Sequence, residues 1–74
     1  PTAVDRPARV TTVRREGDVL VVEGAPAGRR VEVYDLAGRR KVVARTQGGV
    51  TLLRVGRSPL WIVVVGNRRF NVVD

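Results

Sequence analysis

The side chains that enzymes most often use as nucleophiles, general bases or metal ligands are scarce in this sequence. It contains no histidine and no cysteine, which excludes Ser-His and Cys-His pairs and metal sites built from imidazole or thiolate. Its one serine, Ser58, stands between Arg57 and Pro59, where a turn is expected. The carboxylates are spread along the chain, whereas acid–base catalysis needs them to converge in a cleft. We therefore expect no enzyme activity, no catalytic residue, no cofactor and no metal ion.

Arginine is the side chain in this sequence that could bind a partner, because its guanidinium pairs with carboxylates and phosphates. Fourteen basic against seven acidic side chains give a formal charge of +7, and Lys41 is the one lysine. Such an excess attracts anionic partners such as nucleic acid, lipopolysaccharide or an acidic protein groove. Several basic residues form pairs that we expect at strand ends, and the candidate basic surface comprises Arg39, Arg40, Lys41, Arg68 and Arg69. The alternative is that charges at strand ends and edges prevent edge-to-edge aggregation.

Aromatic side chains are too few to favour nucleic acid as the partner. Only Tyr34, Trp61 and Phe70 are present, and proteins that bind single strands usually need several stacking platforms. Trp61 lies in a valine-rich run, which favours a place in the core.

Valine dominates the apolar residues, and apolar positions recur with the period of two that is typical of half-buried strands. Turn residues separate about seven short, mostly antiparallel runs, and no window has helical spacing. We predict an all-β fold, an immunoglobulin-like sandwich of two sheets, with a small closed barrel as the alternative. Residues 1–8 read as a linker or leading segment and residues 9–74 as the sandwich. The expected strands are Arg9–Arg14, Val19–Glu23, Val31–Leu36, Arg40–Arg45, Val50–Val55, Leu60–Val65 and Arg69–Val73.

The most informative segment is the hairpin predicted over residues 31–43. Val31, Val33 and Leu36 mark one face of its first strand, and Tyr34 marks the other face. An aspartate that begins a turn accepts hydrogen bonds from backbone amides just ahead of it, and a glycine supplies the positive φ that turns often need. Asp35 and Gly38 are therefore expected to close the turn.

The last two predicted strands form a second hairpin. Its first strand, Leu60–Val65, is apolar throughout, which indicates a central strand that is covered on both faces or meets a partner on its outer face. Gly66 and Asn67 predict a two-residue turn before the final strand.

Three segments together resemble the C-terminal sorting domains of the type IX secretion system, which are found on proteins exported across the outer membrane of Bacteroidetes. The early strand Val19–Gly24 is similar to the family's first motif. The segment Val31–Arg40 is similar to its strand–Asp-x-x-Gly–basic hairpin. The segments Leu60–Val65 and Arg68–Val73 are similar to its closing hairpin and final apolar strand.

The resemblance implies a seven-stranded immunoglobulin-like sandwich that acts as a non-catalytic secretion signal. It implies recognition in the periplasm by the outer-membrane translocon, removal by a sortase, and attachment of the cargo to anionic lipopolysaccharide at the cell surface. In place of the family's Gly–apolar–Tyr, this chain has Pro59-Leu60-Trp61. This departure favours a component of the machinery that keeps its sorting domain.

The residues expected to carry the fold and its recognition lie in the two hairpins. They are Val31, Val33, Tyr34, Asp35, Gly38, Trp61, Ile62, Val63, Val64, Val65, Phe70, Val72 and Val73. An open sheet edge can also accept a strand from a partner or a second copy, which gives a strand-exchanged dimer as a further expectation. A plain structural sandwich and a basic anion-binding module remain alternatives.

Overall fold

Seven short strands carry the fold, and no helix interrupts them among the described residues. The computed structural model describes residues 10–73, so the predicted leading segment 1–8 lies outside the described residues. The strands are β1 (Thr12–Glu16), β2 (Val19–Glu23), β3 (Arg30–Tyr34), β4 (Arg40–Arg45), β5 (Val50–Arg54), β6 (Leu60–Val65) and β7 (Arg68–Val73).

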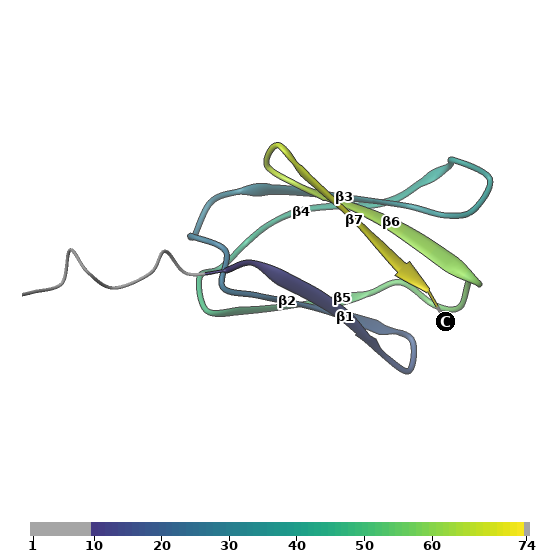
Figure 1. Cartoon of the computed structure of the whole chain (residues 1–74), viewed down its shortest axis with the longest axis horizontal. Coiled ribbons are helices and arrows are strands. Elements are labelled where there is room, and N and C mark those ends of the chain that lie inside the picture. Colours follow the sequence, from purple (N-terminus) through teal and green to yellow (C-terminus); the bar gives the residue numbers. More distant parts are fainter. Residues whose placement is uncertain (1–9, 74) are drawn as a thin grey trace, which may run out of the picture.

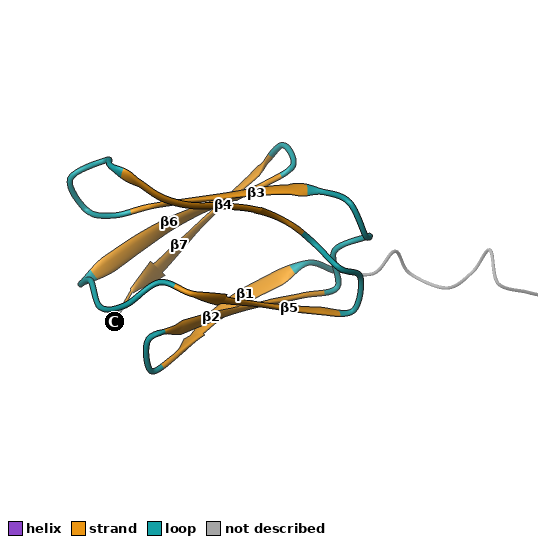
Figure 2. Cartoon of the chain, turned by 180° about the vertical axis from the view of Figure 1, so that it is seen from behind, coloured by secondary structure: helices purple, strands orange, loops and turns teal. Residues whose placement is uncertain are grey.

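The strands form two antiparallel sheets that face each other as two layers (Figure 1). One sheet has the order β1-β2-β5, and the other has the order β4-β3-β6-β7. Seen from behind, the same two layers enclose a common interior (Figure 2). No hydrogen-bonded strand pair joins the sheets within residues 10–73, so the sandwich prediction is confirmed and the closed barrel is wrong.

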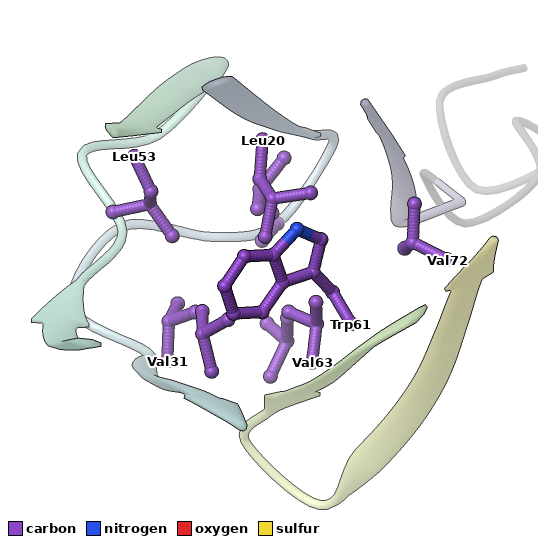
Figure 3. Close-up of a cluster of buried hydrophobic side chains, with 10 residues drawn as sticks. Leu20, Val31, Leu53, Trp61, Val63 and Val72 are labelled. Carbon is purple, nitrogen blue, oxygen red and sulfur yellow. The ribbon is translucent and has the colours of Figure 1, made fainter. Parts of the chain in front are cut away.

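The core is built from the inward-facing residues of both sheets (Figure 3). Trp61 is 1% exposed and lies at its centre, as the sequence predicts. Strand alternation places Leu20 and Leu53 on one side of the indole and Val31 and Val63 on the other. Because every second residue of each central strand is apolar, two sheets are enough to remove these side chains from water.

β3, β5 and β7 differ from the expected bounds by one or two residues at one or both ends, and the larger differences lie in the first strand and at Leu36. The first strand runs over Thr12–Glu16 and not over Arg9–Arg14, because Gly17 with φ +64° lets Glu16 pair directly with Val19. Arg14 and Arg15 consequently lie inside a strand and not at its end. Leu36 is 60% exposed and belongs to no sheet face, since β3 ends at Tyr34 and the turn begins at once.

Candidate recognition surface

The four-stranded sheet contains both predicted hairpins and divides their residues between its two faces. Those on the inner face build the core and hold the sandwich together; they are Val31, Val33, Trp61, Val63, Val65 and Val72. Phe70 packs partly buried against this core, and the guanidinium of Arg68 lies 5.7 Å from its ring centre. Those on the outer face can meet a partner; they are Tyr34, Ile62, Val64 and Val73.

The strand register arranges the outer face in rows. One row runs Val43–Glu32–Val64–Arg69 across the sheet, the next runs Arg40–Tyr34–Ile62–Asn71, and a third pairs Leu60 with Val73. The apolar members of these rows, which we call the outer stripe, are Tyr34, Val43, Leu60, Ile62, Val64 and Val73; Glu32 lies between Val43 and Val64. Apolar patches that are rimmed by polar residues are typical of surfaces that bind another molecule.

Sequence reasoning missed two members of the outer stripe. Val43 follows Val42 in an apolar run, so its alternation was hidden, and only its pairing with Glu32 shows which face it joins. Leu60 precedes Trp61 and becomes an outer residue only once Trp61 is known to be buried. In both cases the missing information was the register between strands.

A hydrogen-bonded carboxylate lies beside the outer stripe. The Tyr34 hydroxyl donates to Glu32 Oε1 at 2.7 Å, and Arg30 Nε lies 2.7 Å from Glu32 Oε2. Arg40 Nη1 is 3.9 Å from the same oxygen. The hydrogen bond from Tyr34 is the main cause that lowers the pKa of Glu32, and it raises the pKa of Tyr34. The pairing lets a charged group occupy the centre of the face beside apolar neighbours.

Tyr34→Phe is expected to raise the pKa of Glu32 toward its ordinary value of 4.5, because the main donor to the carboxylate is lost. Since the folded pKa lies below the unfolded one, the unfolded chain takes up the proton first as the pH falls. The contribution of the network to the free energy of unfolding is therefore complete above about pH 5 and is lost as the pH falls through the folded pKa.

The variant should accordingly lose less stability than the wild type between about pH 6 and about pH 3, measured by urea unfolding. Carboxyl titration by NMR gives the pKa directly. Asp35 is the internal control, because backbone amides and Arg39 lower its pKa and Tyr34 is not a cause. An unchanged pKa of Glu32, or an equal shift at Asp35, would contradict the assignment.

The β3–β4 turn is closed by Asp35, as the sequence predicts. Asp35 Oδ1 accepts hydrogen bonds from the amides of Ala37 and Arg39, both at 2.9 Å, and Oδ2 lies 3.4 Å from Arg39 Nε. Gly38 has φ +84° and donates its amide hydrogen to Asp35 O at 2.9 Å. These contacts commit both residues to the shape of the turn.

The predicted basic residues do not form one patch. Arg39, Arg40 and Lys41 lie where β4 begins, next to Tyr34, whereas Arg68 and Arg69 lie where β7 begins, next to Val65. These positions are at opposite ends of the four-stranded sheet. Two of the five, Arg40 and Arg69, flank the outer stripe and supply part of its charged rim.

A hollow of about 620 Å³ opens at the end of the sandwich that holds the β3–β4 turn. Trp61 lines it together with Lys41 and Arg57, and neither cation has an ion pair among the described residues. The hollow can attract an anion, but its carboxylate, Asp35, is already committed to the turn.

No protein-family model matches this chain, and no curated protein and no solved structure matches it significantly. Within residues 10–73, no cluster of histidine, cysteine or acidic side chains is arranged to hold a metal ion. The same residues include no helix long and apolar enough to cross a membrane. The sandwich and its outer stripe are therefore the features from which a function can be proposed.

Proposed function

We propose that this chain is a non-catalytic sorting and docking domain of the type IX secretion pathway, which directs its parent protein through the outer-membrane translocon to the cell surface. The observation that carries the proposal is that the β3–β4 hairpin and the β6–β7 hairpin form one sheet with a shared outer stripe. The two segments that most resemble the sorting domains therefore act as one surface, although about twenty residues separate them in the sequence.

The topology also supports the proposal. β1, β2 and β5 share one sheet, and β3, β6 and β7 share the other. This partition matches strands A, B and E and strands C, F and G of the immunoglobulin-type sandwich, with β4 joined to the second sheet. The resemblance of the sequence to the sorting domains implies a seven-stranded sandwich, and seven strands in two sheets support that part of the proposal.

Recognition in this proposal uses the folded outer face and not a reactive group. The outer stripe supplies apolar contact, while Arg40, Arg69 and Arg30 supply a positive rim that suits an acidic partner. The translocon is the first partner, a sortase the second, and anionic lipopolysaccharide the surface on which the cargo arrives. Retention of the domain on a component of the machinery would leave the outer stripe available after export.

The test is export of a reporter protein fused to this chain in a bacterium that has type IX secretion. Val43 and Val73 are 48% and 72% exposed, so Val43→Glu with Val73→Glu alters the outer stripe without opening the core. We expect the reporter to accumulate in the periplasm, with at least about a tenfold loss at the cell surface, because each glutamate breaks apolar contact at the docking face.

The matched control is Val10→Glu with Leu36→Glu. These residues are 69% and 60% exposed and lie off the stripe. The net charge changes by the same amount because both variants add two glutamates. The control should export normally. Normal export of the stripe variant would remove the stripe from the mechanism, and export through an unrelated sandwich in place of this chain would leave only a structural role.

A further inference from the structure

We propose that β5 is a docking edge for a second copy of this chain. The two β5 strands pair antiparallel across a two-fold axis at Leu52 and join two three-stranded sheets into one. This inference concerns the sheet opposite the outer stripe, so it does not depend on the proposed secretion role.

Among the described residues the two sheets have four edge strands, and three of them carry features that discourage pairing. β1 points Arg15 inward, opposite the core residue Leu20. β4 contains a bulge, because Tyr34 pairs with Arg40 and Lys41 is left without a partner residue on β3. β7 begins with two arginines. Inward charges, bulges and basic residues are the common means by which proteins block edge-to-edge contact.

β5 has none of these features over Val50–Leu53. Its register with β2 is continuous, it contains no proline, and its one charged residue, Arg54, is the last of the strand. Leu52 is 65% exposed in the middle of the strand, and Val50 is also exposed. A flat edge with exposed apolar side chains is the arrangement that favours strand addition.

The backbone of β5 presents regularly spaced groups to this edge. Gly24 donates its amide hydrogen to Gly49 O at 3.0 Å, and Val55 donates to Asp18 O at 2.9 Å. The pairs just beyond each end of the β2–β5 ladder are therefore hydrogen-bonded pairs. Antiparallel pairs alternate between bonded and non-bonded, so Thr51 and Leu53 bond to β2. The N–H and C=O groups of Val50, Leu52 and Arg54 therefore point away from β2, toward the free edge.

The side chains of this edge are complementary to themselves. A two-fold axis at Leu52 places Leu52 opposite its counterpart in the second copy. In each copy Val21 lies next to Leu52 in this row and Arg14 lies next to Val21, so the row is apolar at its centre and basic at both ends. In the neighbouring row, Arg54 lies beside Val50 of the second copy. That Val50 pairs with Glu23 on β2 of its own copy. Opposite charges thus share each outer row, and the two Arg54 side chains lie at opposite ends of the interface.

The interface is one short strand long, so the dimer should be weak and reversible. Edge pairing of this length buries less than the roughly 1,200 Å² of a standard stable interface. The net charge of +7 on each copy opposes association, and salt near physiological strength screens that repulsion beyond about 8 Å. The dissociation constant of the dimer is therefore expected in the upper micromolar range.

Sedimentation equilibrium of the 74-residue chain tests the dimer at concentrations from about 10 µM to about 1 mM, the range expected for a small interface. The wild type should move from monomer to dimer over this range. Leu52→Lys should raise the dissociation constant by about tenfold or more, because two like charges then face each other at the axis. Leu36→Lys is the matched control, since Leu36 is 60% exposed, lies off the edge and gains the same charge.

Hydrogen exchange tests the edge residue by residue. The amides of Val50, Leu52 and Arg54 should slow at high concentration, whereas those of Thr51 and Leu53 are already protected by β2 and should change little. Leu52→Pro removes one edge donor and no bond to β2, so it should keep the fold by circular dichroism and lose the dimer.

Several results would overturn the proposal: a wild type that stays monomeric to about 1 mM, equal weakening by Leu52→Lys and Leu36→Lys, or a dimer in which the three edge amides exchange as fast as in the monomer. An unrelated extended peptide of alternating valine and threonine provides the remaining comparison. If that peptide slows the edge amides while the chain alone stays monomeric, the edge accepts a foreign strand and not a second copy.

Discussion

Trp61→Ala is expected to unfold this domain at room temperature. Trp61 is 1% exposed, and its indole fills the space between the two sheets (Figure 3). Truncating a buried tryptophan costs about 3–5 kcal/mol, because the transfer energy is lost and a cavity remains. Small domains have only about 0.05–0.15 kcal/mol of stability per residue, so a chain of this length has little to spare.

Trp61→Phe is the control that separates lost volume from lost chemistry. Among the described residues, the indole N–H of Trp61 is buried without a hydrogen-bond partner, which is an unfavourable feature that phenylalanine does not have. We expect Trp61→Phe to remain folded with a smaller loss of stability. Urea unfolding followed by far-ultraviolet circular dichroism measures both variants, and a folded Trp61→Ala domain would contradict the central role of the indole.

The sandwich could be predicted because local signals and the global fold agree. The alternation in Val31–Tyr34 identifies the core face of β3, and Asp35 with Gly38 fixes the turn that follows. Gly66 similarly sets the two-residue turn in which Val65 pairs with Arg68. These signals are contained within a few residues, so they need no knowledge of distant strands.

The outer stripe and the docking edge could not be predicted in the same way. Val43 joins the stripe through its register with Glu32 on another strand, and the bulge at Lys41 decides that register. The open edge at β5 exists because β4 pairs with β3 in the other sheet, which leaves one side of β5 without a neighbour within residues 10–73. The first feature depends on the register between two strands and the second on the order of strands in a sheet, and no single segment of the sequence determines either.

Removing residues 68–74 is expected to abolish the folded state. β7 pairs with β6 along its whole length, from Leu60 opposite Val73 to Val65 opposite Arg68. The deletion takes Val72 and Phe70 from the core and leaves the most apolar strand of the chain as an open edge. The loss of one strand's backbone hydrogen bonds adds to this cost, so circular dichroism should show an unfolded chain.

A synthetic peptide of residues 68–74 should restore the fold when it is added to the truncated chain, by supplying the missing strand. Val72 is 8% exposed and faces the core, whereas Val73 is 72% exposed on the outer face. A peptide with Val72→Asp should therefore fail, and a peptide with Val73→Asp should still complete the sandwich. Equal behaviour of the two peptides would mean that β7 does not present these neighbouring valines to opposite faces.

This pair of valines also decides how loss of export is to be interpreted. Under the proposed secretion role, a chain without β7 would fail in export because it lacks a fold, so the deletion does not test the outer stripe as a docking surface. Changing Val73 leaves the core in place because its side chain lies outside the sandwich. A folded Val73→Asp chain that is not exported would therefore identify the outer stripe as the docking surface, whereas normal export of that chain would assign β7 a structural role alone.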